Sequence, residues 1–202
     1  MPSLRITATV VLCLCLVHLP AGATGIEPLE VVVRLQASLL QAMKNAEELG
    51  YQGRFNQLEP VVTSSHDLSF VARLAVGKYW KTFDDEQKVR FVSIFHKLSI
   101  STYADRFDGY AGEQFTVVSQ KQRPRGKMLV ETLLTKSDGE ELHFNYLLRQ
   151  VDDHWRIINI MVDGVSDLAL KRAEYTSLVK KEGFAALIRK IEAQIALYEN
   201  GQ

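Results

Sequence analysis

The spacing of apolar residues changes twice along this chain, from a helical period to a strand period and back again. Between Pro28 and Phe107 they recur at steps of three and four residues, and between Gln114 and Val162 at every second position. After Gly164 the helical spacing returns. Because the strand candidates follow one another without intervening helices, they predict an antiparallel meander rather than βαβ units. We therefore expect an α+β domain: N-terminal helices, a four-stranded antiparallel meander, and C-terminal helices packed on one face of a curved sheet.

Helix ends are marked by proline, glycine and capping residues. Pro28 suits the first turn of a helix, and Gly50 is expected to close that helix. Asp67 and Asp84 precede helical stretches as capping residues, and Pro60 is expected to disturb a short helical piece. The helical segments expected in the chain are residues 28–50, 55–62, 67–77, 82–108 and two segments after Gly164 separated by Gly183.

The middle of the chain carries the strand pattern. Leu142, Phe144, Tyr146 and Leu148 alternate with polar residues, as in a strand with one buried face. Turn residues stand at Ser137-Asp138-Gly139 and at Val151-Asp152-Asp153. The four strands are expected at residues 114–122, 127–136, 141–150 and 155–162.

The N-terminus has the layout of a cleaved secretory signal. Arg5 is the first charged residue, an apolar block covers residues 6–19, and Ala21-Gly22-Ala23 supplies small residues at a cleavage site. The block is shorter than the roughly 20 apolar residues of a membrane anchor, and a lipoprotein signal at Cys13 would usually carry a small residue in place of Leu12. We expect residues 1–23 to be removed and residues 24–202 to form one monomeric domain in the periplasm.

Charge and cysteine content exclude several classes. The chain has 24 basic and 24 acidic residues, so nothing favours nucleic acid or an anionic membrane surface as a partner. Cys13 and Cys15 both lie in the segment expected to be removed, so the mature domain is expected to lack disulfides and thiolate metal sites. The hydrophobic core must then hold the domain, and 47% hydrophobic residues can build one.

No arrangement typical of catalysis is found in the sequence. Phosphate loops, nucleophile elbows and helical metal-binding histidine pairs are missing. Ser166 follows Asp163 closely, but it is better placed to cap the next helix than to act as a nucleophile. We expect no catalytic residue, no metal and no cofactor. An enzyme would need a buried acid–base pair, for which His143 and His154 are the nearest bases.

Aromatic residues are abundant in the helical half and on the sheet. They could simply fill a core, or they could line an apolar cavity between helices and sheet. Periodicity alone does not separate these two interpretations.

A series of short motifs resembles the MlaC-type periplasmic lipid-binding proteins, also called toluene-tolerance auxiliary proteins. The motifs run through nearly the whole mature chain: Asp67-Leu68, Gly77, Trp80, Asp85-Glu86-Gln87, Phe91, Phe95, Leu98, Tyr103-Ala104, Tyr110, Trp155-Arg156, Gly164-Val165-Ser166, Arg172, Tyr175, Gly183-Phe184 and Leu187-Ile188. The resemblance implies a soluble carrier that moves a phospholipid between the inner and outer membranes. Its implied partners are an inner-membrane ABC transporter complex and an outer-membrane lipoprotein complex.

One departure bears on the cargo. Family members often carry Asn-Tyr-Arg where this chain has Leu170-Lys171-Arg172. That variant resembles the branch associated with hopanoid biosynthesis, so a hopanoid is the alternative to a diacyl phospholipid. A non-carrier interaction subunit with a solid core, and a small pocket enzyme, remain the alternatives to a carrier.

A lipid pocket in this fold would be deep, apolar and nearly free of buried charge. One face of the middle strands and the helices opposite would supply its wall. The lipid-binding residues expected on this basis are Phe70, Leu74, Phe91, Phe95, Tyr103, Met128, Val130, Phe144, Tyr146, Leu148, Ile158, Ile160, Val165, Leu168 and Tyr175. Arg172 is the candidate for headgroup contact at the mouth, with an ion pair to a neighbouring acid as its alternative.

Overall fold

The computed structural model describes residues 26–201, so the expected signal segment lies outside the described residues. The chain forms helices, then strands, then helix, in the order expected. The elements are α1 (Pro28–Lys44), α2 (Ala46–Ser65), α3 (Leu68–Val76), the 3-10 helix η1 (Gly77–Thr82), α4 (Asp85–Arg106), β1 (Gln114–Arg123), β2 (Lys127–Thr135), β3 (Glu141–Val151), β4 (His154–Val162), β5 (Val165–Ser166) and α5 (Asp167–Glu199).

The strands form one antiparallel sheet in the order β1-β2-β3-β4-β5. The expected meander is therefore confirmed, with one addition. After β4 the chain turns at Asp163 and Gly164, both with positive φ (49° and 80°), and Ser166 pairs back with Met161. This two-residue strand is too short to show an alternating pattern, which is why it was not expected from the sequence.

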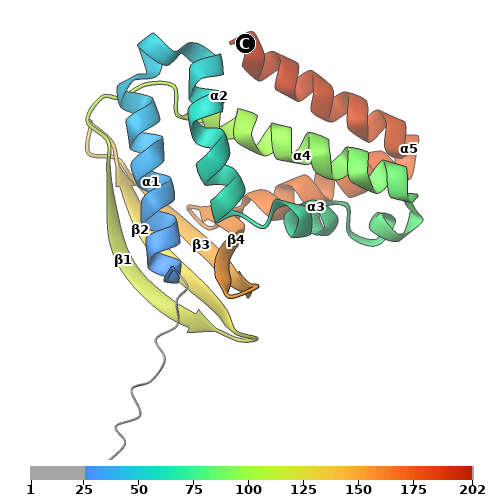
Figure 1. Ribbon diagram of the computed structural model, residues 1–202, viewed down its shortest axis with the longest axis horizontal. Coiled ribbons are helices and arrows are strands. Elements are labelled where there is room, and N and C mark those ends of the chain that lie inside the picture. Colours follow the sequence, from blue (N-terminus) through green and yellow to red (C-terminus); the bar gives the residue numbers. More distant parts are fainter. Residues whose placement is uncertain (1–25, 202) are drawn as a thin grey trace, which may run out of the picture.

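The helices cover one face of the curved sheet (Figure 1). Helix α1 runs across the strands, and α4 lies alongside the C-terminal part of α5 further from the sheet. The buried Gln36 of α1 donates hydrogen bonds to Thr132 Oγ1 on β2 (2.8 Å) and to Tyr146 Oη on β3 (3.2 Å). These bonds fix α1 against the sheet, since buried polar groups are costly without partners.

Three of the expected caps are present. The Asp67 side chain accepts a hydrogen bond from Phe70 N, and Ser166 Oγ accepts one from Ala169 N. Asp84 and Gln87 form a reciprocal capping box at the start of α4. Ser166 thus has the capping role expected for it.

Helix boundaries differ from expectation in the second element. Helix α1 ends at Lys44, and Gly50, expected to end the first helix, instead marks a break inside α2 with φ 58°. Pro60 does not end α2, because it is exposed and solvent can reach the carbonyl that loses its donor. Gly183 breaks α5 with φ 80°, where the sequence predicts two helical segments.

A single hydrophobic core joins all layers. Its largest fully buried side chains are Leu35, Leu39, Leu58, Phe91, Phe95, Tyr146, Leu148, Ile157, Leu187, Ile188 and Ile191.

None of the described helices has both the length and the apolarity needed to cross a bilayer.

Candidate functional site: an apolar cavity between sheet and helices

A cavity of about 510 Å³ lies between the sheet and the helices α3, α4 and α5. Its wall is mostly apolar, with polar side chains mainly from the α4–β1 connection, the β2–β3 turn and the start of α5. The lining residues are Met43, His66, Leu68, Val71, Phe95, Ser99, Thr102, Tyr103, Arg106, Phe107, Asp108, Gly109, Glu113, Leu134, Lys136, Leu142, Phe144, Ile157, Ile158, Asn159, Ile160, Val162, Asp167, Leu168 and Lys171. The volume is within the usual range of small-molecule sites.

Strand alternation and one bulge build the sheet side of the wall. Leu142 and Phe144 point to the same face of β3, as their spacing of two predicts. On β4 the register shifts so that Leu148 faces Ile157 while Leu147 faces Asn159. Ile158 is therefore an extra residue, and the bulge buries both Ile157 and Ile158 against the cavity.

One stripe of α4 builds the helical side. Phe95, Ser99, Thr102 and Arg106 follow one another at steps of three and four, so they share a face of the helix. The hydroxyls of Ser99 and Thr102 donate to carbonyls of their own helix, at Phe95 O and Leu98 O (both 2.8 Å). These hydroxyls are thereby satisfied and add little polarity to the cavity.

His66 and Tyr103 form the main polar pair inside the cavity. Tyr103 Oη lies 3.0 Å from His66 Nε2, and the two rings meet edge to face at 5.6 Å. His66 Nδ1 lies 3.1 Å from Val62 O and 2.9 Å from Ser65 Oγ. Burial lowers the pKa of His66 to about 4, and burial also raises the pKa of Tyr103 well above its ordinary value. Both side chains are neutral at pH 7.

Charged residues of both signs are among those that line the cavity. Arg106 is the last residue of α4, Asp108 lies in the connection that follows, and Lys136 follows β2. At the start of α5, Lys171 donates to Asp167 across 2.8 Å. These side chains can therefore accommodate the polar group of a ligand, while the isoleucines of β4 and Phe95 contact its apolar part.

Some of the residues expected to bind lipid line this cavity, and others do not. Those that line it are Phe95, Tyr103, Phe144, Ile158, Ile160 and Leu168. The remainder do not line it: Phe70, Leu74, Phe91, Met128, Val130, Tyr146, Leu148, Val165, Arg172 and Tyr175.

The residues outside the wall have other neighbours. Phe91 and Tyr175 pack in an aromatic cluster against each other, with ring centroids 6.4 Å apart. Phe70 lies under the Arg149 guanidinium at 4.0 Å. Val165 is 54% exposed. The Arg172 guanidinium lies against Gly77, and Arg172 does not line the cavity as expected.

The buried strand residues Val130, Tyr146 and Leu148 belong to the hydrophobic core and do not line the cavity. Sequence reasoning missed most of the lining residues, including His66, Val71, Thr102, Arg106 and Lys171. The i+4 and i+7 steps from Phe95 along α4 could have identified Thr102, whereas no pattern in the sequence marks His66.

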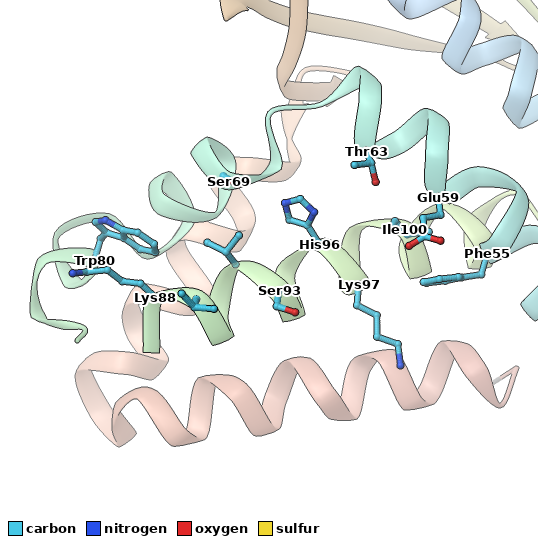
Figure 2. Close-up of a pocket in the computed structure, with 12 residues that line it drawn as sticks. Phe55, Glu59, Thr63, Ser69, Trp80, Lys88, Ser93, His96, Lys97 and Ile100 are labelled. Carbon is cyan, nitrogen blue, oxygen red and sulfur yellow. The ribbon is translucent and has the colours of Figure 1, made fainter. Parts of the chain in front are cut away.

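A second hollow, of about 940 Å³, lies on another side of α4, between α2, α3 and η1 (Figure 2). Figure 2 shows its side chains spread along α4, with Trp80 at one end and Phe55 at the other. Glu59, Thr63 and Ser93 on its rim are exposed to solvent. We regard the smaller cavity as the candidate site because it lies between the sheet and the helices and is less open to solvent than this hollow.

The comparisons with known proteins identify the family. The family model described as "MlaC protein" matches residues 34–193. The chain belongs to the MlaC family.

Two relatives extend this finding. The intermembrane phospholipid transport system binding protein MlaC of Haemophilus influenzae is 22% identical over 141 residues, which cover 68% of this chain and 64% of that protein. The chain thus matches somewhat less than two thirds of that relative's length. A phospholipid-binding protein from Ralstonia solanacearum, solved in complex with a phospholipid, superposes with a TM-score of 0.76 at 16% identity, over 86% of this chain and 99% of that one. At this identity the superposition establishes a shared fold.

Burial of His66 predicts a specific loss of stability in acid. Its pKa is about 4 in the folded protein and about 6.5 when unfolded, so the unfolded chain binds the extra proton between these values. Stability from the neutral imidazole is present above pH 6.5 and is lost as pH falls towards 4, by about 3 kcal/mol. Urea unfolding should therefore show that the free energy of unfolding decreases more between pH 7 and pH 4 in the wild type than in His66→Gln. The two decreases should differ by about that amount. Parallel decreases in the two proteins would contradict this assignment.

Proposed function

We propose that this MlaC-family protein is a periplasmic carrier that holds the apolar part of a membrane lipid in the cavity between its sheet and α4. The observation that carries the proposal is the 510 Å³ cavity between sheet and helices, whose mostly apolar wall also includes charged side chains of both signs. A lipid has the same division into an apolar and a polar part. The phospholipid named for both relatives favours a phospholipid as cargo.

The physics of transfer explains why a carrier is needed. Each methylene moved out of water is worth about 0.8 kcal/mol, so an acyl chain of about 16 carbons represents roughly 12 kcal/mol. Free diffusion of such a molecule across an aqueous compartment is negligible. A carrier must match the membrane rather than greatly exceed it, because a much tighter pocket would never release its cargo.

We further propose that loading and unloading take place at two membrane complexes. The name of the H. influenzae relative refers to an intermembrane phospholipid transport system. By analogy, an inner-membrane ABC transporter complex and an outer-membrane lipoprotein complex would be the partners of this chain. The expected signal segment fits such a location, since it would export the domain to the periplasm.

The polar pair in the cavity favours binding over catalysis. His66 has no carboxylate among its hydrogen-bond partners, which are Val62 O, Ser65 Oγ and Tyr103 Oη. A pKa of about 4 makes its imidazole a poor general base near neutral pH. His143 and His154, the bases considered from the sequence, are exposed and do not line the cavity.

The test is the identity of the molecule that co-purifies with the protein. Residues 24–202 would be produced in the periplasm, purified without detergent and extracted with organic solvent, and the extract analysed by mass spectrometry. We expect a phospholipid in near-stoichiometric amount. A hopanoid in the extract would support the carrier function but contradict a phospholipid cargo. An extract with no lipid would contradict the proposal.

A further inference from the structure

Basic residues stand opposite one another on neighbouring strands at one end of the sheet. Arg123 of β1 is paired with Lys127 of β2. Arg149 of β3 is paired with Arg156 of β4. Continued by one residue, the register between β2 and β3 also places Lys127 opposite Arg149. These residues form one row across four adjacent strands, here called the basic row, and Arg125 stands beside it in the turn between β1 and β2.

The basic row lies on the sheet face that points away from the core. Leu148 and Ile157 precede and follow Arg149 and Arg156 along their strands, and both are fully buried in the core. Successive side chains of a strand alternate between the two faces, so the two arginines belong to the opposite face. The helices cover the core face (Figure 1), which leaves the basic row on the outer side of the sheet.

Most of this positive charge has no counter-ion in the described part of the chain. Arg149 Nε donates to Asp67 Oδ2 across 2.8 Å, so Arg149 is already paired. Arg123, Lys127 and Arg156 make no ion pair with any residue between 26 and 201. Arg123 is exposed, and the other two are partly exposed. These three cations are therefore available to a partner.

By itself, such a row is unfavourable for the fold. Like charges directly opposite each other on neighbouring strands destabilise a sheet. The whole chain has 24 basic and 24 acidic residues, so a general excess of positive charge does not explain the row. A surface that keeps unpaired cations together at a cost to stability is suited to an anionic partner.

The spacing of the row favours a helix as that partner. Adjacent strands are about 4.8 Å apart, so the four positions span about 14 Å. Acidic residues at positions i, i+4, i+7 and i+11 of a helix share one face and span about 16 Å along its axis. On an extended strand, four side chains of one face span about 20 Å. An acidic helix that crosses the strands therefore matches the row more closely than an acidic strand does.

Two carboxylates at the same end of the sheet argue against an anionic bilayer as the partner. Asp152 and Asp153 are exposed in the turn between β3 and β4. They lie three residues beyond the row, which corresponds to about 10 Å along a strand. A membrane surface laid over the row would also meet these carboxylates. A helix that is about 10–12 Å wide and centred on the row stops short of them.

We propose that the basic row is a docking surface for a partner protein that presents a helix with a stripe of acidic residues. The inference rests on the proposed carrier function, because a carrier has to dock where it takes up or releases its lipid. Lys136, which lines the cavity, lies at the opposite end of β2 from the row. Nine residues of strand separate the two ends by about 30 Å, so a helix on the row leaves that part of the cavity uncovered.

The first experiment uses two synthetic peptides of equal composition, each held helical by side-chain staples. One carries four glutamates at i, i+4, i+7 and i+11, and in the other the glutamates are distributed around the helix. Binding to the wild-type protein is measured by fluorescence anisotropy. At low ionic strength we expect the striped peptide to bind at least about tenfold more tightly, and high salt should abolish this preference. Equal affinity for the two peptides would overturn the inference.

The second experiment tests whether the row is the site of binding. Lys127→Glu/Arg156→Glu should bind the two peptides equally. Lys180→Glu/Lys181→Glu is the matched control, because it changes the net charge by the same amount at exposed positions of α5. The control should keep the preference of the wild type. An unchanged preference in the first variant, or equal loss in both variants, would overturn the inference.

Urea unfolding separates a docking role from a structural one. Lys127→Glu places a carboxylate between Arg123 and Arg149, so repulsion across the strands becomes attraction. We expect the midpoint of urea unfolding to increase in this variant while the preference for the striped peptide decreases. A decreased midpoint would show that the row serves the fold, and it would overturn the inference.

Three further measurements distinguish other partners and the carrier function. Binding of the wild type to vesicles of phosphatidylglycerol and phosphatidylethanolamine, without a preference for the striped peptide, would replace the helix by a membrane surface. A dimer that Lys127→Glu/Arg156→Glu dissociates would replace it by a second copy of the chain. Either result would overturn the inference. The lipid content of this variant should equal that of the wild type, whereas a wild type without lipid would contradict the carrier function and leave the peptide test unaffected.

Discussion

Replacing Phe144 by glutamate is expected to remove bound lipid from a protein that still folds. Phe144 lines the cavity and packs against Phe115 and Tyr146, with ring centroids 5.9 and 6.2 Å away. In the empty cavity a carboxylate can keep water around it, but an acyl chain would exclude that water and leave the charge unpaired. We expect the lipid content after detergent-free purification, measured as moles of lipid per mole of protein, to decrease at least about tenfold.

Leu170→Glu is the matched control for this change. Leu170 lies on α5 near the cavity but is 60% exposed and does not line it. The same substitution there should leave both the lipid content and the circular dichroism spectrum as in the wild type. Unchanged lipid in Phe144→Glu, or equal loss in both variants, would show that the wall is wrongly placed.

Truncating Phe91 to alanine is expected to reduce the free energy of unfolding by about 3–5 kcal/mol. Phe91 is fully buried on α4, where its ring meets those of Phe83 at 6.2 Å and Phe95 at 5.9 Å. The loss combines the transfer of the ring to water with the void left in a cluster that cannot fully collapse. Urea unfolding followed by tryptophan fluorescence measures it, on the assumption of two-state behaviour.

Val89→Ala provides the comparison on the same helix. Val89 is 72% exposed, so its truncation should change the free energy of unfolding by no more than about 0.5 kcal/mol. Because Phe91 does not line the cavity, the folded fraction of Phe91→Ala should keep the lipid content of the wild type. A destabilisation below about 1 kcal/mol, or selective loss of lipid, would place Phe91 in the wall rather than in the core.

Most of the fold followed from short-range features of the sequence. The alternation from Leu142 to Leu148 placed β3, and the capping residues Asp84 and Ser166 placed two helix starts. Two features could not be found in this way. β5 has only two residues, too few to show an alternating pattern. Gly50 has a positive φ inside α2, and a glycine in the sequence looks the same whether it ends a helix or interrupts one.

The site could be predicted only in part, because periodicity shows which residues are buried but not what covers them. Helix α4 has neighbours on several sides, so Phe91 faces an aromatic cluster while Phe95 reaches the cavity, although both look alike in sequence. On β4 the bulge at Ile158 changes which residues face inward, and its position depends on pairing with β3. His66 reaches the cavity through its bridge to Ile157, a contact between residues distant in the chain.

The most direct test of the account is a crystal structure of the mature protein with its co-purified lipid. The account predicts hydrocarbon density between β4 and α4, in contact with Ile158, Ile160 and Phe95, and a polar group beside Arg106 and Lys171. Density for the chain in the open hollow next to Trp80 and His96, with the space between sheet and helices filled by side chains, would contradict it.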